Sequence, residues 1–580
     1  MKLECTGCGG VLKLMDRTHA VCPYCGRKYL IDEAKGTLIH IQVDYSGNEE
    51  LRKKVNRTKN VLIGFLSIAS VVVLILFGFN IAARKSVFST SDEDLPADAN
   101  GELFVIFCKD IFGKAYDQIT AEELESIRYL RCSYEREGNT DFNVISYSFT
   151  DYEDCENERE FQRTVKKWTY RTRMVSWPSD YSMFTGLTRV DTTGSAWLSM
   201  LHFSPDNQIS CVDTEDGLDM VAQVLNPEKI KILHIGVMGI SLEGVEQFTS
   251  LEELEVETTL ASQVVDVSGI EACRKLKRLR LSCGEGYKGL DKLKELPGLV
   301  SLYIDHIPLG ECVFLKELAG LEELSICAGE EPDLSPLNSL TGLKRVYFID
   351  QKYIPLEQIR ILQDMPGLEE LMIAVDDQAC LEELAKLKSL KALDLHMAIF
   401  KYQVPTDVSV LAGLANAERI QLDNFYGQEI TGVEPILNLP GLKTFRLGRI
   451  ASSPVKLLLD PEALSDNPSI EELGFTACHP ETKDGGEELE FEFLEHYPGV
   501  KWLYLDDCGV KDVSFVKKME DLRGCSLKRN RIEDLSPVLE CRRLEAVCAD
   551  EDAARGVEFP PEVQVYTKVY EEIYKYSIFQ

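Results

Sequence analysis

Apolar residues recur through the C-terminal half of the chain in the pattern L-x-x-L-x-L, with other apolar residues replacing leucine in places. The string occurs fourteen times, with copies starting at residues 230, 251, 276, 299, 321, 343, 368, 390, 417, 442, 470, 500, 522 and 544. Successive starts lie 21 to 30 residues apart, and 22 is the commonest step. The L-x-L part has the two-residue period of a β-strand, so two apolar side chains share one face. We therefore expect one short strand in each copy.

The residues between the strings predict how each repeat returns to the next strand. Stretches such as Leu290–Leu296 and Leu381–Leu387 suit a helical or irregular arm, and glycine often precedes the next string, as in Pro297-Gly298. One repeat cannot bury its own apolar face, so neighbours stack into a curved solenoid with a parallel sheet. A helical solenoid is the rival fold, but about 22 residues is too short for its two-helix units.

The fourteen strings resemble those of the leucine-rich-repeat family, and we assign residues 230–580 to such repeats. The resemblance implies an α/β fold, with a parallel β-sheet and helical or irregular return arms, and a role in recognising a protein, peptide or glycan. Bacterial surface proteins of this family are the nearest type. The repeat length here varies more than in regular members, and no consistent asparagine ladder occurs.

The outward residues around each L-x-L dyad would form the concave face of the sheet. Binding hot spots are enriched in arginine and aromatic residues. The candidate ligand contacts on this face are Tyr303, Tyr347, Arg419, Arg446, Trp502 and Tyr504. Trp502 and Tyr504 are the strongest candidates, because large aromatic side chains on a solvent-facing surface need an explanation. The alternative is that all six are merely solvated strand positions.

A different pattern occupies residues 61–83, which read VLIGFLSIASVVVLILFGFNIAA and contain no charged residue. As a helix rising about 1.5 Å per residue, this stretch would cross roughly 30 Å of hydrocarbon. A signal peptide would begin near residue 1 and have a shorter apolar core. A buried helix of a soluble domain would rarely be so long without a charge. We therefore predict a single transmembrane helix.

The charges beside this helix predict its orientation. Five basic residues lie within 52–59 before the helix, whereas Arg84 and Lys85 follow it and precede an acidic stretch. The larger basic cluster is expected in the cytoplasm. Residues 1–85 carry 13 basic and 7 acidic side chains, although the whole chain has a net charge of -33. We expect a cell-membrane protein with a cytoplasmic N-terminus, a basic juxtamembrane linker at 36–60 and extracellular repeats.

Two C-x2-C pairs near the N-terminus predict a metal site. Cys5 and Cys8 are followed after thirteen residues by Cys22 and Cys25, and four thiolates suit tetrahedral Zn²⁺. The knuckles CTGCGG and CPYCGR resemble those of zinc ribbons, which implies one structural zinc ion in residues 1–35. Residues 10–14, 27–31 and 37–43 look like short strands. A redox dithiol or a pair of disulfides is the competing interpretation, but a thioredoxin-like context is absent and a cytoplasmic disulfide is disfavoured.

Residues 84–229 connect the predicted membrane helix to the repeats. Residues 84–100 are rich in Ser, Asp, Ala and Pro, which suggests an exposed stalk with little structure. Residues 101–229 form a mixed α/β flank, where Thr120-Ala121-Glu122-Glu123 is a capping box that predicts a helix through Leu130. Degenerate strings at 127–132 and 184–191 suggest that this flank closes the end of the repeat array.

The other fourteen cysteines all lie beyond residue 100. Cys525 replaces a core leucine of its string, as expected for a buried thiol. Cys478 and Cys508 occupy the same place in adjacent repeats, where about 5 Å separates equivalent positions. A disulfide and a pair of stacked thiols both remain open for these two residues.

No constellation of catalytic residues is visible in the sequence, and we expect no enzymatic activity. Gly284-x-Gly286-x-x-Gly289 has the spacing of a dinucleotide-binding loop, but its short helix and repeat spacing fit the solenoid better. The favoured function is recognition of a protein, peptide or glycan. The alternatives are a transmembrane sensor, in which the ribbon contacts a cytoplasmic partner, and a tethered zinc-ribbon regulator that binds nucleic acid. The acidic charge balance makes nucleic acid an improbable partner of the repeats.

Overall fold

The computed structural model describes residues 13–14, 19–21, 28–32, 37–40, 87–95, 111–114, 118–136, 143–152, 154–155, 161–162, 164–172, 181–193, 197–237, 242–258, 264–282, 286–350, 352–397, 406–424, 429–448, 455–483 and 489–567. The chain divides into two units, Met1–Ala82 and Ala83–Gln580. The transmembrane helix expected at 61–83 lies outside the described residues. Among the residues that are described, no helix has the length and apolar character needed to cross a membrane.

The first unit contains a four-stranded antiparallel sheet. Its strands are β1 (Lys13–Leu14), β2 (His19–Val21), β3 (Lys28–Asp32) and β4 (Thr37–His40), and they pair in chain order. The short strands expected near residues 10–14, 27–31 and 37–43 are therefore present. The four predicted zinc ligands, Cys5, Cys8, Cys22 and Cys25, lie outside the described residues.

The second unit is built on one long sheet. Its strands in spatial order are β5 (Val87–Leu95), β8 (Lys166–Thr172), β7 (Asn143–Thr150), β6 (Tyr129–Arg136), β9 (Arg189–Asp191), β10 (Cys211–Thr214), β11 (Ile232–Val237), β12 (Glu253–Thr258), β14 (Arg278–Ser282), β16 (Ser301–Pro308), β17 (Glu323–Cys327), β18 (Arg345–Phe348), β19 (Glu370–Val375), β20 (Ala392–Met397), β22 (Arg419–Asn424), β24 (Thr444–Gly448), β26 (Glu472–Phe475), β28 (Trp502–Tyr504), β29 (Gly524–Ser526), β30 (Ala546–Cys548) and β31 (Gln564–Tyr566). From β9 to β31 every neighbouring pair is parallel.

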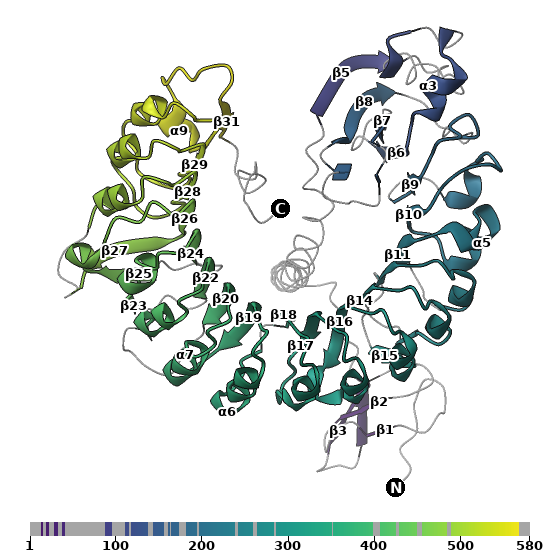
Figure 1. Ribbon diagram of the computed structural model, residues 1–580, viewed down its shortest axis with the longest axis horizontal. Coiled ribbons are helices and arrows are strands. Elements are labelled where there is room, and N and C mark those ends of the chain that lie inside the picture. The colour runs from purple at the N-terminus through teal and green to yellow at the C-terminus, as the bar shows by residue number, and fades with distance from the viewer. Residues whose placement is uncertain are drawn as a thin grey trace. The chain divides into compact units, whose positions relative to one another are not determined.

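Each of the fourteen L-x-x-L-x-L strings supplies one strand of this sheet, which begins at the third residue of the string. The apolar positions face a continuous core, as in the second string, where Leu251, Leu254 and Val256 are buried. In Figure 1 the strands of this unit follow an arc, and the helical turns lie on its outer side. The expected leucine-rich-repeat solenoid with a parallel sheet is confirmed.

The return arms are short helical turns, because a repeat of about 22 residues leaves little chain after its strand. Within the described residues, the α-helices with given bounds are α3 (Ala121–Glu125), α5 (Leu218–Val224), α6 (Leu356–Ile359), α7 (Gln378–Leu384), α8 (Glu434–Leu437) and α9 (Glu551–Ala554). Most other arms are 3-10 turns, such as η7 (Leu290–Glu295), η9 (Val313–Glu317), η12 (Ser409–Gly413) and η15 (Ser514–Lys518).

Two small parallel sheets add to the arms. One joins β13 (Val264–Asp266) to β15 (Gly286–Lys288), and the other has the order β21 (Thr406–Asp407), β23 (Glu429–Thr431), β25 (Val455–Leu459) and β27 (Cys478–Thr482). They lie in the longer repeats, whose extra residues form these additional strands.

The flank before residue 230 differs from the expectation in two respects. The capping box at Thr120 is present, but helix α3 ends at Glu125 rather than Leu130, because Tyr129 already begins strand β6. Strand β5 occupies residues 87–95 of the expected stalk and pairs with β8. Val87 and Phe88 favour a strand, so the start of this segment has more structure than its Ser- and Asp-rich composition suggests. The degenerate strings at 127–132 and 184–191 do form strands, β6 and β9.

Cys478 and Cys508 are both buried thiols rather than a disulfide. Each donates a hydrogen bond to a carbonyl oxygen of the preceding repeat, from Cys478 Sγ to Leu447 O at 3.5 Å and from Cys508 Sγ to Phe475 O at 2.8 Å. Burial raises the pKa of both thiols. Stacked thiols, one of the two possibilities open from the sequence, therefore occupy this place.

Candidate binding surface on the concave face

The strand register places the outward residues of the repeats in rows across the sheet. The first row contains the third residue of each string and includes Glu253, Arg278, Ser301, Glu323, Arg345, Glu370, Ala392, Arg419, Thr444, Glu472, Trp502 and Gly524. The second row contains the fifth residue and includes His234, Glu255, Arg280, Tyr303, Ser325, Tyr347, Met372, Asp394, Gln421, Arg446, Gly474, Tyr504 and Ser526. We call these two rows the concave face.

The six residues predicted as ligand contacts all lie in these rows, but most of them are far apart. Eight strand spacings separate Tyr303 on β16 from Tyr504 on β28, which is about 40 Å along the sheet at the usual strand spacing. Arg446 and Tyr504 are in contact, with the guanidinium carbon 4.4 Å from the ring centre. The six residues therefore mark one extended face rather than a single cluster.

The aromatic residues on this face contact charged neighbours. The guanidinium of Arg280 lies 3.6 Å from the ring centre of Tyr303. The Tyr347 hydroxyl donates a hydrogen bond to Glu370 Oε2 at 3.1 Å. Burial raises the pKa of both tyrosines, so their hydroxyl groups stay protonated at neutral pH.

The expected exposure of Trp502 and Tyr504 is wrong. Their exposed fractions are 7% and 1%, and they pack with Ala546, Cys548 and Tyr566. Glycines on adjacent strands make this packing possible, because a Cβ at Gly524 would lie 2.4 Å from Cζ3 of Trp502. The sequence pattern identifies outward positions, but it does not show that side chains from neighbouring repeats cover one another there.

Carboxylates gather at the centre of the face and at the next outward position along the strands, where His396 pairs in register with Asp423. Arg419 Nη2 lies 3.4 Å from Glu370 Oε2 and 3.5 Å from Asp394 Oδ2. Burial raises the pKa of Asp394 although Arg419 opposes the shift, and burial raises the pKa of Asp423 to about 6. Nδ1 of His396 lies 3.4 Å from Asp423 Oδ2, and burial lowers the pKa of this histidine. We call Glu370, Asp394 and Asp423 the acidic centre.

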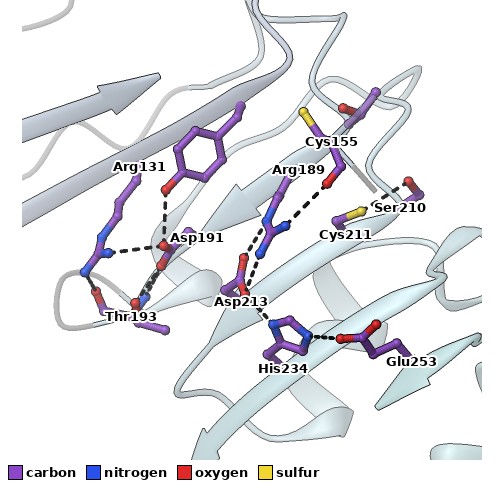
Figure 2. A network of polar contacts seen from close by, with 12 residues as sticks. Arg131, Cys155, Arg189, Asp191, Thr193, Ser210, Cys211, Asp213, His234 and Glu253 are labelled. Atoms are coloured by element: carbon purple, nitrogen blue, oxygen red, sulfur yellow. Dashed lines mark hydrogen bonds and ion pairs between the residues drawn. The ribbon is translucent and has the colours of Figure 1, made fainter. Parts of the chain in front are cut away.

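A second network crosses the N-terminal strands, as Figure 2 shows. Arg189 is buried on β9 and forms a paired contact with Asp213 on β10, with Nε–Oδ2 at 2.8 Å and Nη2–Oδ1 at 3.0 Å. His234 lies between two carboxylates, with Nδ1 at 2.7 Å from Asp213 and Nε2 at 3.0 Å from Glu253. Glu253 in turn pairs with Arg278. Charges of alternating sign therefore run across five adjacent strands.

These contacts fix the protonation of the network. Burial alone would lower the pKa of His234, but hydrogen bonds to Asp213 and Glu253 raise it to about 10. Burial opposes ionisation of Glu253, yet His234 and Arg278 lower its pKa to about 2. At neutral pH the network is fully charged.

The contacts between Arg189, Asp213 and His234 are not evident from the sequence alone. The available signal was weak, because β9 and β10 belong to repeats that have largely lost the leucine string. Only the fragment at 184–191 pointed to β9, and nothing pointed to β10. Strand pairing was needed to place the three side chains next to one another.

The described residues do not include a group of three or more His, Cys, Asp or Glu side chains placed to hold a metal ion. The predicted zinc ligands lie outside the described residues. The contacts described on the concave face are ion pairs and cation–aromatic contacts.

Comparison with known protein families finds no match, and no curated protein matches the chain. Several solved structures are similar. An internalin (inlF) from Listeria monocytogenes has 20% sequence identity and a TM-score of 0.39, with 55% of this chain and 87% of that chain covered. A leucine-rich-repeat protein of Leptospira interrogans has 14% identity and a TM-score of 0.40, covering 67% and 88%. The mouse RP105/MD-1 complex has 15% identity and a TM-score of 0.34, covering 59% and 65%. The strings and the strand register of this chain give it a solenoid fold of the leucine-rich-repeat type.

Proposed function

We propose that the protein is a recognition module that binds a partner protein through its concave face. The observation that carries this proposal is the acidic centre, where Glu370, Asp394 and Asp423 lie near one another with Arg419 between two of them. The raised pKa values of Asp394 and Asp423 mean that these carboxylates lack full stabilisation of their charge. A lysine or arginine side chain of a partner would supply it.

A protein is favoured over a glycan as the ligand. Sugar rings commonly stack on exposed aromatic faces, whereas Trp502 and Tyr504 are buried and Arg280 covers Tyr303. Protein hot spots combine arginine and tyrosine with neighbouring carboxylates, as this face does. The rows also extend over many strands, which provides the area that a protein interface requires.

The test compares binding of a basic peptide panel to the full chain and to the double variant Asp394→Asn and Asp423→Asn. We expect the wild-type chain to bind Lys- and Arg-containing peptides with an affinity that falls as salt rises, and the variant to bind about tenfold more weakly. Glu462→Gln, which removes one exposed carboxylate on a return arm, is the control for loss of surface charge away from the acidic centre. Equal binding by all three proteins would contradict the proposal.

We further propose that residues 61–83 span the cell membrane and place the solenoid outside the cell. The uncharged apolar run and the larger basic cluster before it support this topology. Treatment of intact cells with an impermeant protease should remove the C-terminal half and leave residues 1–60 protected. Protection of the C-terminal half, with protease access to a surface control, would place the solenoid inside.

The N-terminal unit is proposed to hold one structural zinc ion through Cys5, Cys8, Cys22 and Cys25. The β2–β3 connection contains the second C-x2-C pair, and the first pair precedes β1, an order that suits two knuckles carried by a small antiparallel sheet. Metal analysis should find about one zinc per chain. Cys22→Ser should lose it, and an unchanged zinc content would exclude these ligands.

Two other functions are kept as alternatives. In a transmembrane sensor, ligand binding outside would be reported to a cytoplasmic partner of the ribbon, so residues 1–60 would recover a specific partner from cells. In a zinc-ribbon regulator, the N-terminal unit would bind nucleic acid. The absence of salt-dependent nucleic-acid binding by the full chain would count against that role.

A further inference from the structure

Charged residues form a ladder along the edge of the main sheet where the strands begin. The second residue of each string is charged in all copies but one: Lys231, Glu252, Lys277, Glu322, Lys344, Glu369, Lys391, Glu418, Lys443, Glu471, Lys501, Arg523 and Glu545. Neighbouring members pair across repeats, for example Lys277 Nζ with Glu252 at 2.6 Å, Lys344 with Glu322 at 2.9 Å and Lys501 with Glu471 at 2.9 Å. We call this row the charge ladder.

The exception is Val300, which interrupts the charge ladder between Lys277 and Glu322. The backbone register continues through this position, because Val300 N donates to Lys277 O at 2.9 Å and Glu322 N donates to Val300 O at 2.8 Å. The side chain of Val300 is 37% exposed, so it is not part of the core. An apolar residue therefore stands on the surface between a cation and an anion.

A pocket of about 410 Å³ lies at this interruption. It is lined by Glu252, Arg274, Lys275, Lys277, Gly298 and Val300. Val300 distinguishes this repeat, because every other string carries a charged residue at the same position, whereas the glycine before the string also occurs at residues 320, 342, 367, 441 and 499. Its floor thus has an apolar part beside three cations.

The charge of the pocket is opposite to that of the whole protein. Three basic side chains face one carboxylate, Glu252, in a chain with a net charge of -33. Lys277 pairs with Glu252, and Lys275 Nζ contacts only a neutral group among its described partners, Ser250 Oγ at 3.3 Å. Arg274 is exposed and has no ion-pair partner within the described part of the chain. Cationic side chains therefore remain available to an incoming anion.

We propose that this pocket binds an acidic peptide segment of a partner protein, with a carboxylate at Arg274 and Lys275 and an adjacent apolar side chain against Val300. The site lies at the sheet edge, outside the acidic centre. The inference rests on the proposed function only in that the ligand belongs to a protein.

Other anionic ligands fit the pocket less well. Nucleic acids and anionic membranes present many regularly spaced charges and need an extended basic surface. Here the cations that line the pocket all lie within residues 274–277, and Glu252 lies among them. The surrounding charge ladder continues with carboxylates such as Glu322. The carboxylates of Glu252 and Glu322 would repel a ligand with many negative charges. A short segment with one or two carboxylates and an apolar neighbour avoids most of this repulsion.

The experiment measures binding of the detergent-purified full chain to immobilised peptides that combine Asp or Glu with each apolar residue at adjacent positions. Control peptides carry Asn or Gln in place of Asp or Glu and therefore lack the negative charge. A single-stranded oligonucleotide and phosphatidylserine vesicles test the other two classes of anionic ligand. Val300→Glu places a carboxylate in the pocket. There it can form an ion pair with Lys277, while the carboxylate of Glu322 repels it. The thermal midpoint should therefore change little, while binding of the acidic peptides falls about tenfold.

Lys391→Ala is the matched control, because it removes one charge-ladder cation from a repeat without the pocket. It should bind the acidic peptides as the wild-type chain does, and so should the double variant Asp394→Asn and Asp423→Asn. Three outcomes would overturn the proposal that the pocket binds an acidic peptide. They are no binding by any peptide of the panel, equal binding of the uncharged peptides, and undiminished peptide binding by Val300→Glu. Pocket-dependent binding of the oligonucleotide or vesicles alone would also overturn it. If only the double variant of Asp394 and Asp423 lost acidic-peptide binding, the peptides would bind at the concave face and not in the pocket.

Discussion

Arg189 and Asp213 form a paired, buried contact that links strands β9 and β10, with both donor–acceptor distances at or below 3.0 Å. Arg189 is 1% exposed, and its guanidinium also lies 4.5 Å from the ring centre of Phe161. The pair joins two degenerate N-terminal repeats, and the hydrogen bond between Asp213 and His234 on β11 continues the link to the first regular repeat.

Asp213→Asn should destabilise the solenoid by about 3–5 kcal/mol, because it leaves the buried guanidinium without its carboxylate. Arg189→Met should cost less, about 2 kcal/mol, since Asp213 retains the hydrogen bond to His234. Urea unfolding followed by tryptophan fluorescence measures both values. Equal effects of the two substitutions would show that His234 does not support Asp213.

The His234 network predicts how stability depends on pH. The pKa of His234 is raised from 6.5 to about 10 in the folded chain, so its contribution is complete below pH 6.5 and is lost as pH rises toward 10. We expect the free energy of unfolding to fall by about 1–2 kcal/mol over this range, less than the full shift implies because the side chain retains contact with solvent. His234→Gln should flatten this part of the profile. If the free energy of unfolding of the wild-type chain did not change over this pH range, the result would contradict the claim that His234 is charged in the folded chain.

Gly524→Ala should destabilise the C-terminal repeats. Its Cβ would lie 2.4 Å from Cζ3 of Trp502 and 2.6 Å from Cε3, so the buried indole must move, at about 1–3 kcal/mol. Gly441→Ala is the control, because its nearest contact is Ala417 O at 3.8 Å, an ordinary distance. Similar unfolding midpoints for the two variants would mean that Trp502 does not pack over Gly524.

The buried thiols should resist alkylation in the folded chain. Cys478, Cys508 and Cys525 are buried, and burial raises the pKa of each. The reactive thiolate is therefore scarce near neutral pH. Iodoacetamide labelling at pH 8, read by mass spectrometry of the peptides, should leave these three unmodified until urea unfolds the chain. Rapid labelling of any of them in the native protein would show local opening of its repeat.

The fold was predictable because its signal is repeated. Fourteen copies of one string specify the buried positions, and every copy begins its strand at the third residue. The flank was harder to predict, because β9 and β10 have lost most of that string. In the flank, α3 ends early because strand β6 begins at Tyr129 and pairs with β7 and β9. Strand β5 forms where it pairs with β8.

The candidate surface was predictable in its rows but not in its contacts. Tyr303, Tyr347, Arg419 and Arg446 lie in outward rows as expected, since strand periodicity alone determines that placement. The burial of Trp502 depends on Gly524 of the next repeat, and the Arg446–Tyr504 contact passes over Gly474, so both depend on three-dimensional register. The sign changes of the charge ladder were present in the sequence, but only the register shows that they pair.

Position-specific photo-crosslinking tests most directly whether the concave face binds a partner protein. A photoreactive amino acid would replace Met372, beside the acidic centre, in one variant and Val313, which is 64% exposed on the outer arm η9, in another. After illumination of cells that express the protein naturally, we predict a discrete protein adduct from position 372 that excess basic peptide suppresses, and none from position 313. Adducts from position 313 alone, or adducts from position 372 that are insensitive to the peptide, would contradict recognition through the concave face.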